Sequence, residues 1–192
     1  MRWALPRIPW AMALIALALS VIGPGLAQSQ QSDGETTVEI SDFVGEWQGM
    51  GILETEDSLF FAMNRRDLDV IISGSEREFT VEWTTITRSG TNPDDPEIRR
   101  NSSSLTFRPA DHPNVFEARS SGSPLNGDVM SWARLNGQTL SVYQMSITEG
   151  GGYSVATYDR TLTDDAMQLR FVRLQDGQPT REVNGQLSQV EQ

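Results

Sequence analysis

The sequence predicts an all-β protein: a single antiparallel up-and-down barrel of eight to ten strands that follows a cleaved signal peptide. From Val38 onward, short runs rich in Val, Ile, Thr and aromatic residues recur, with apolar and polar positions alternating. Turn-forming sequences separate these runs, and helical periodicity is scarce. Hairpins that follow one another in this way form a meander, and closing the meander into a barrel removes its exposed edges.

The first segment, residues 1–27, has the three parts of a secretory signal peptide. Arg2 and Arg7 make its start positive, Ile8 to Ile22 is apolar, and small residues favour cleavage near Ala27-Gln28. The alternative is a retained membrane anchor. The apolar run is about 15 residues, shorter than the roughly 20 that a spanning helix needs, so cleavage is favoured. We therefore expect a periplasmic or secreted bacterial protein without a stable membrane span.

Residues 28–37 are polar and predict a disordered leader, and residues 38–192 predict one β-barrel domain. Without Arg2 and Arg7 the net charge moves from −11 to −13, a sign that disfavours nucleic acid and anionic lipid surfaces. The chain contains no Cys, so we expect neither a disulfide nor a lipidated cysteine. We therefore expect a hydrophobic core large enough to stabilise the domain without disulfides.

Sequence alternation predicts ten strands, and turn residues lie between them. Asn136-Gly137 and Asp176-Gly177 are two-residue hairpin sequences, and Ser73-Gly74-Ser75 and Gly150-Gly151-Gly152 predict further links. Longer loops are expected over 90–97 and 120–128. The expected strands are near 46–53, 67–73, 78–87, 103–108, 115–119, 129–135, 139–148, 153–162, 167–174 and 181–187.

One stretch, Thr55 to Arg66, leaves two interpretations open. Glu56-Asp57-Ser58 resembles a helix N-terminus, and Leu59, Met63 and Arg66 have helical spacing. The adjacent pair Phe60-Phe61 fits an extended strand equally well.

Strand alternation places large apolar side chains on candidate inward faces. Trp83 shares a face with Phe79 and Val81. Two further faces each carry an arginine two residues beyond an aromatic residue: Trp132 with Arg134, and Phe171 with Arg173. A guanidinium that points inward requires a partner, because burying an unpaired charge costs several kcal/mol. Asp159, Glu117 and a ligand anion are the candidate partners.

Three interpretations of these arginines remain open. In the first, each arginine covers a tryptophan by stacking, a contact worth roughly 0.5–2 kcal/mol, and caps an end of the barrel. Alternatively, an inward arginine holds the carboxylate or sulfate of a ligand, or the arginines point outward at strand ends. The related sequence Tyr158-Asp159-Arg160 either ties neighbouring strands through a charge-assisted hydrogen bond or forms a rim ion pair, and we favour the rim pair.

The segment Asp42-Phe43-Val44-Gly45-Glu46-Trp47 resembles the Gly-x-Trp element in the first strand of lipocalin and calycin barrels. Arg173 stands where that group often has an arginine packed on the same tryptophan. The resemblance implies an up-and-down barrel that binds a small hydrophobic molecule, and a few bacterial members inhibit proteases. It gives Gly45, Trp47 and Arg173 a structural role, with the Trp47 ring at the barrel base. The missing disulfide and the lack of a clear helix after the strands are departures from the pattern.

We find no catalytic constellation, metal site or cofactor motif in the sequence. His112 is the single histidine, in a turn between two prolines, and nothing places it near Ser131 or Ser154 for a triad. The acidic clusters at 54–57 and 94–97 lack the spacing of a calcium loop, so we expect them to be solvent-exposed loops.

Two functional hypotheses follow. In the first, the barrel carries a small apolar or anionic amphipathic ligand, bound by the candidate interior residues Trp83, Trp132, Arg134, Phe171 and Arg173. In the second, a barrel filled by its own side chains binds another envelope protein, as an inhibitor or assembly factor. A barrel of about eight strands has an interior just wide enough for either, so a lined void would favour the first hypothesis.

Overall fold

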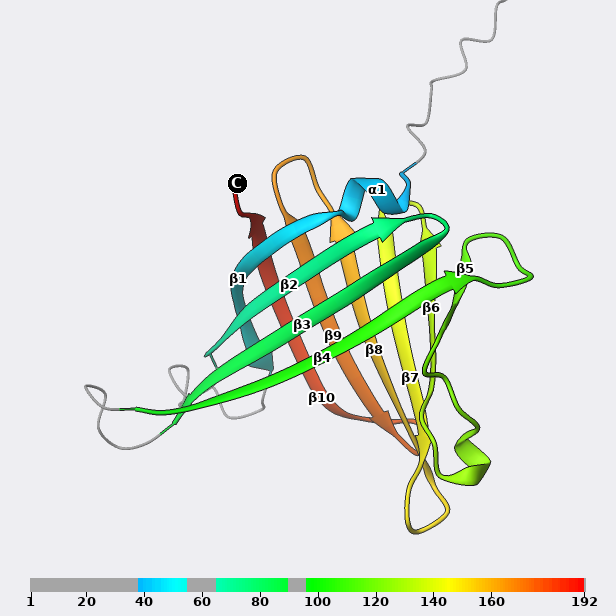
Figure 1. The fold of residues 1–192 in the computed structure, drawn as a ribbon. Coiled ribbons are helices and arrows are strands. Elements are labelled where there is room, and N and C mark those ends of the chain that lie inside the picture. The colour runs from blue at the N-terminus through cyan, green and yellow to red at the C-terminus, as the bar shows by residue number, and fades with distance from the viewer. Residues whose placement is uncertain (1–37, 55–64, 90–95, 192) are drawn as a thin grey trace, which may run out of the picture. The chain divides into compact units, whose positions relative to one another are not determined.

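The chain forms a closed antiparallel barrel (Figure 1), and the computed structural model describes residues 38–54, 65–89 and 96–191. Ten strands pair in the order β1-β10-β9-β8-β7-β6-β5-β4-β3-β2, so each strand pairs with its neighbours in sequence and β1 closes on β10. The predicted fold class is confirmed. The strands are β1 Gly45–Glu54, β2 Arg65–Ser75, β3 Glu78–Ser89, β4 Glu97–Pro109, β5 Val115–Ala118, β6 Met130–Asn136, β7 Thr139–Ile147, β8 Tyr153–Leu162, β9 Met167–Gln175 and β10 Gln178–Gln189.

Several predictions lie outside the described residues: the signal peptide and leader at 1–37, the two-way interpretation of 55–64, and most of the loop at 90–97. The described residues include a short helix that the sequence did not predict, α1 (Ile40–Phe43), and a 3-10 turn, η2 (Pro124–Asn126), within the predicted loop 120–128. Neither of these helices is long and apolar enough to cross a membrane.

Two of the predicted turns differ in register from the structure. The β6–β7 turn is Gly137-Gln138, because Asn136 already pairs with Thr139, and only the glycine has positive φ (55°). The β2–β3 turn lies beyond Gly74, which stays within the strand. A Cβ on Gly74 would lie 2.3 Å from the Glu78 carbonyl oxygen, so close backbone approach explains this glycine. The Asp176-Gly177 hairpin is confirmed, with φ of 50° and 80°.

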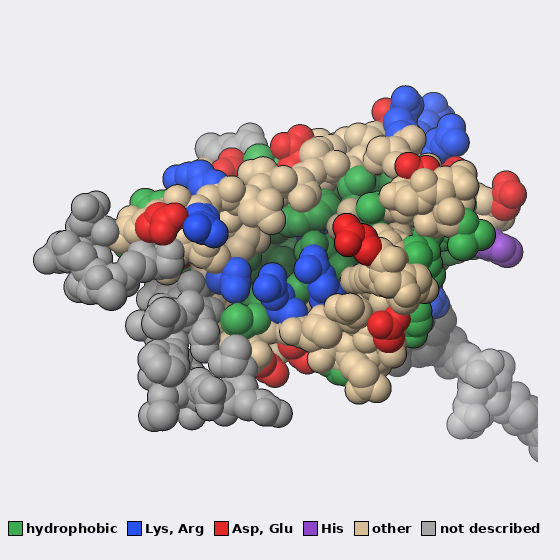
Figure 2. Space-filling model, turned by 90° about the horizontal axis from the view of Figure 1, so that it is seen from below, with side chains coloured by type: hydrophobic (Ala, Val, Ile, Leu, Met, Phe, Trp, Pro, Cys, Tyr) green, Lys and Arg blue, Asp and Glu red, His purple; other side chains and the backbone are tan. Residues whose placement is uncertain are grey.

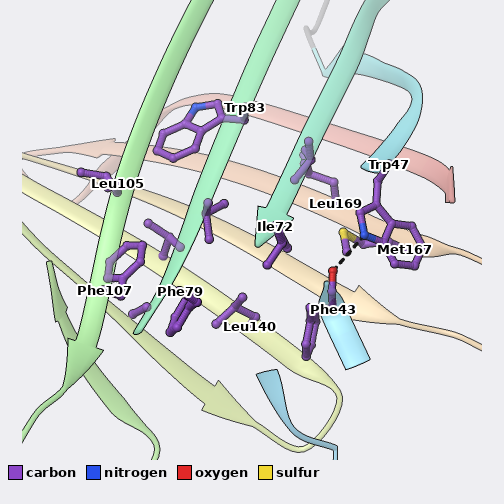
Figure 3. Packing of buried hydrophobic residues seen from close by; sticks show 14 of the residues in the cluster. Phe43, Trp47, Ile72, Phe79, Trp83, Leu105, Phe107, Leu140, Met167 and Leu169 are labelled. Atoms are coloured by element: carbon purple, nitrogen blue, oxygen red, sulfur yellow. Dashed lines mark hydrogen bonds between the residues drawn. The ribbon is translucent and has the colours of Figure 1, made fainter. Parts of the chain in front are cut away.

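Helix α1 lies across one end of the barrel, which we call the closed end (Figure 1). Its side chains Ile40 and Phe43 are 1% and 0% exposed. Beneath them the interior is packed with side chains (Figure 3), including Phe79 and Phe107, whose ring centroids are 5.2 Å apart. Other fully buried members are Ile72, Val81, Leu140, Val142, Met167 and Leu187.

Trp47 belongs to this closed end, where its ring is 6% exposed. Its indole N–H donates to the carbonyl of Phe43 at 3.0 Å and ties the first strand to α1 (Figure 3). Gly45 begins the strand with φ of 147°, and a Cβ there would lie 2.5 Å from the Gln189 side chain. The structure therefore gives both residues of the Gly-x-Trp element a packing role at this end of the barrel.

Strand β6 faces the opposite way from the prediction. Its inward residues are Ser131, Ala133 and Leu135, all buried, so Trp132 and Arg134 lie on the outer face. Shifting a strand's facing by one residue exchanges every side chain between the two faces. Small residues suit this wall because Ala133 lies directly opposite the bulky Phe116, whose ring already packs edge-on against Phe79 at 5.0 Å.

Candidate functional site: a cationic cavity

The half of the barrel away from α1, which we call the open end, contains a cavity of about 260 Å³. This volume is slightly below the roughly 300–1,000 Å³ typical of small-molecule sites. Viewed from this end, the molecule is hollowed over apolar side chains, with basic side chains gathered beside the hollow (Figure 2). The residues that line the cavity include Arg66, Leu68, Val70, Trp83, Asn101, Ser103, Tyr158, Arg160, Leu169, Phe171, Arg173, Arg181 and Val183.

Arg160 is the deepest charged group of the cavity. It lies on β8 and its side chain is 0% exposed, yet Nε, Nη1 and Nη2 all lack a hydrogen-bond partner. Burial lowers the pKa of this guanidinium to about 10, against smaller opposing effects of Tyr158 and Asp159, and it remains cationic at neutral pH. A shift of this size corresponds to a penalty on the order of 3 kcal/mol. Such a group is poised to donate to an anion.

The contacts that Arg160 does make are with aromatic rings. Its guanidinium carbon lies 5.5 Å from the centroid of Trp83 and 5.8 Å from that of Tyr158. Desolvated cation–π contacts contribute about 2 kcal/mol or more, but they leave the N–H groups unpaired. The rings therefore orient Arg160 and offset part of its burial cost, while its hydrogen-bonding capacity remains unused.

One wall of the cavity is aromatic. The Tyr158 ring lies 5.0 Å from Trp83 and 4.7 Å from Phe171, centroid to centroid. Burial raises the pKa of the Tyr158 phenol, while nearby Arg173, Arg160 and Arg181 and a hydrogen bond with the Trp83 side chain act in the opposite direction. The phenol is therefore neutral at physiological pH, and its hydroxyl can donate to a ligand.

Four more arginines line the cavity: Arg66, Arg99, Arg173 and Arg181. Arg99 is paired with Glu97 at 3.3 Å, whereas the other three lie at the mouth without an ion pair among the described residues. Arg173 and Arg181 are directly opposite each other on β9 and β10. Burial, followed by repulsion from Arg181, lowers the pKa of Arg66, and Arg66 Nε is buried without a hydrogen-bond partner. Like charges directly opposite across strands are destabilising, so this mouth is built at a cost to the fold.

Within the described residues, no acidic side chain forms an ion pair with Arg66, Arg160, Arg173 or Arg181. The ion pairs found there involve other basic side chains: Arg88, Arg99, Arg108, Arg119 and Arg170. Asp69 also borders the cavity, but it alternates with the inward-facing Leu68 and Val70 on β2, so its side chain belongs to the outer face. The protein as a whole has a net charge of −11, which makes this cationic interior a local reversal of sign.

The structure brings together three of the five predicted interior residues. Trp83, Phe171 and Arg173 line the cavity. Trp132 and Arg134 do not, and their assignment to the interior was wrong: Trp132 stacks on Tyr143 across the outer face at 4.9 Å, and Arg134 is exposed.

The expected packing of Arg173 on Trp47 is also wrong. Arg173 lies over Phe171, with its guanidinium carbon 5.7 Å from the ring centroid. It is near the open end of β9, whereas Trp47 lies at the closed end of β1, where it pairs with Gln189 and Val70. The two residues therefore belong to opposite halves of the barrel.

The carboxylates proposed as partners of the inward arginines are engaged elsewhere. Asp159 accepts a hydrogen bond from Ser141 at 2.6 Å, and Glu117 pairs with Arg108 at 3.3 Å on the outer face. Both predicted roles of Arg160, as a strand tie or a rim ion pair, are wrong, because alternation along β8 sends Arg160 inward and Asp159 outward. An inward arginine thus has no acidic partner from its own strand.

Sequence reasoning missed Tyr158, Arg160, Arg66 and Arg181 as site residues. A signal for the first two was present: Ala156, Tyr158, Arg160 and Leu162 form an inward face with the same aromatic–arginine spacing as Phe171 and Arg173. Arg66 and Arg181 are placed by barrel closure, which sequence spacing does not reveal.

The cavity lining consists mainly of cationic, aromatic, apolar and hydroxyl side chains. Within the ranges that the structure describes, no three His, Cys, Asp or Glu side chains gather as metal ligands. His112 lies in the exposed turn between β4 and β5. The cavity offers hydrogen-bond donors and aromatic surface, which are the properties of a binding site.

No family model matches this chain, and no curated protein matches it. Among solved structures it is similar to Rv2717c from M. tuberculosis, with a TM-score of 0.46 and 12% identity, over 79% of this chain and 95% of that one. It is also similar to the S-type phycobiliprotein lyase CPES from Guillardia theta, with a TM-score of 0.34 and 9% identity, over 82% of this chain and 96% of that one. Such low values carry no functional argument. The strand pairing of the chain itself defines its class: a closed antiparallel β-barrel of ten strands.

Proposed function

We propose that this protein is an exported β-barrel that binds a small amphipathic molecule inside its open end. The apolar part of the ligand packs against Trp83, Tyr158 and Phe171, and an anionic group accepts hydrogen bonds from Arg160. Export to the periplasm or the medium is part of the proposal, supported by the composition of residues 1–27.

The observation that carries this proposal is the guanidinium of Arg160, fully buried and without a hydrogen-bond partner beside an aromatic-lined cavity. Buried polar groups in proteins are almost always paired, so a cation left with three unsatisfied nitrogens requires an explanation. An anionic ligand group supplies the missing acceptors, and hydrogen bonds to charged groups contribute about 1.5–3 kcal/mol each.

The alternative, a barrel filled by its own side chains that binds another protein, fits the closed end but not the open end. The lined void at the open end is the feature that favours a small ligand. Electrostatics also favours an anion: an acidic exterior around a cationic opening directs negative ligands to that opening.

The proposal is tested by titrating the protein with 1-anilinonaphthalene-8-sulfonate, an anionic aromatic probe, and displacing the probe with decanoate or decan-1-ol. We expect saturable fluorescence enhancement, displacement by decanoate, and weaker displacement by the alcohol. Arg160→Met should weaken decanoate binding at least about tenfold, the loss of one charge-assisted hydrogen bond.

Arg134→Gln is the matched control, because it removes the same charge from the outer face of the barrel. It should leave both titrations unchanged. Equal decanoate affinity in wild type and Arg160→Met, or no saturable binding of either compound, would overturn the proposal.

A further inference from the structure

We infer that the ligand carries two anionic groups separated by an apolar spacer, one at Arg160 and the second at the mouth between Arg66, Arg173 and Arg181. This inference rests on the proposed function and specifies the chemical class of the ligand: an elongated amphipathic dianion.

The first step is that the mouth arginines form a second site, distinct from Arg160. Arg160 is fully buried and oriented by Trp83 and Tyr158, whereas Arg173 is exposed and lies over Phe171. Arg160 is directly opposite Leu169, and Arg173 follows four residues further along β9. At about 3.3 Å per residue, the two arginines leave the barrel wall about 13 Å apart along the strand.

The second step is that Arg66, Arg173 and Arg181 are not paired with acids among the described residues, unlike Arg99, which also lines the cavity and is paired with Glu97 at 3.3 Å. Arg173 and Arg181 are paired across strands, and Arg181 acts on Arg66 strongly enough to contribute to its lowered pKa. None of the three has an ion-pair partner in the part of the chain that the structure describes. Three converging cations form a fork for a carboxylate, sulfate or phosphate group.

The third step is that the cavity between the two cationic sites offers apolar surface beside the polar side chains of Thr85, Asn101 and Ser103. Leu68, Val70, Phe171 and Val183 line the cavity. An inorganic ion leaves this apolar surface unused. A molecule with a hydrocarbon or aromatic body and an acidic group at each end satisfies all three regions.

The test compares decanoate with decanedioate, two compounds of equal chain length that differ by one carboxylate, using isothermal titration calorimetry at fixed salt. We expect decanedioate to bind wild type at least about fivefold more tightly. In the Arg173→Gln/Arg181→Gln double variant that advantage should disappear, so that decanoate and decanedioate bind with equal affinity, and any loss that the two compounds share is the general electrostatic effect of the opening. Both substitutions are at exposed positions, so the fold should persist.

The outcomes separate the two proposals. If decanoate and decanedioate bind wild type equally, the second anionic site is wrong and the proposed function stands. If neither compound binds, both proposals fail together. If the double variant keeps the decanedioate advantage of the wild type, the second carboxylate does not bind at Arg173 and Arg181, and the dianion inference is overturned while the proposed function stands.

Discussion

The two halves of this barrel are built from the same strands but filled in opposite ways. At the closed end, Phe43, Phe79 and Phe107 are at most 1% exposed, and the Phe79 and Phe107 rings stack with their centroids 5.2 Å apart. At the open end the same strands surround a cavity of about 260 Å³, where Arg66, Arg160, Arg173 and Arg181 have no ion-pair partner among the described residues. The packed side chains of the closed end therefore stabilise the fold, whereas the arginines of the open end reduce its stability.

Strand length explains how one sheet serves both purposes. β3 carries Phe79 and Val81 towards the closed end and Trp83, Thr85 and Thr87 towards the open end. β9 likewise begins with Met167 in the core and ends with Arg173 at the mouth. The hydrophobic packing of the closed end thus offsets the free-energy cost of burying arginine side chains at the open end.

The largest expected effect is at the closed end. Phe79→Ala removes a ring that contacts both Phe107 and Phe116, and we expect it to lower the free energy of unfolding by about 3–5 kcal/mol. Urea denaturation measures this change. Ile71→Ala, on the outer face of the neighbouring strand at 42% exposure, is the control and should change stability by about 0.5 kcal/mol or less. If Phe79→Ala lowers the free energy of unfolding by less than about 1 kcal/mol, the closed end is not the main source of stability, contrary to our comparison of the two halves.

The next effect has the opposite sign. Arg160→Met replaces an unpaired buried charge by an apolar side chain of similar length, so the ligand-free protein should become more stable by about 1–4 kcal/mol. The same urea experiment, without ligand, measures the gain. If Arg160 instead stabilises the fold through its aromatic contacts, the variant will be less stable than wild type. That result would remove the main reason for proposing that the cavity binds an anion.

The smallest effect is a pH dependence at Tyr158. Burial raises the pKa of its phenol, so the folded protein keeps this proton at a pH where the unfolded chain has lost it. The contribution of Tyr158 to stability is therefore complete below about pH 10 and is lost as the pH rises beyond that value. Ultraviolet absorbance of tyrosinate should show a late phase among the three tyrosines.

Tyr158→Phe should abolish that late phase, and Tyr143→Phe, on the outer face, should leave it in place. An unchanged alkaline titration in Tyr158→Phe would show that the phenol is not held in a buried environment, and would weaken the description of the open end as a desolvated chamber.

The sequence predicted the architecture well because alternation and turn residues are local signals. The ten expected strands correspond to the ten observed, and the hairpin at Asp176-Gly177 has the expected positive φ at both residues. It predicted the site less well. Trp83, Phe171 and Arg173 line the cavity, whereas Trp132 and Arg134 lie outside it because Ser131, Ala133 and Leu135 occupy the inward face of β6, where Phe116 lies opposite Ala133.

By itself, then, the sequence determined the strand order, most of the turns and the glycine and tryptophan of the first strand, all of which depend on short-range spacing and backbone geometry. Only the tertiary structure decided which face of β6 is inside, that Arg160 has no partner, and that Arg66 meets Arg181. These features depend on barrel closure, because closure brings β1, β2 and β10 side by side and fixes how much volume each inward position has. No local pattern along the chain carries that information.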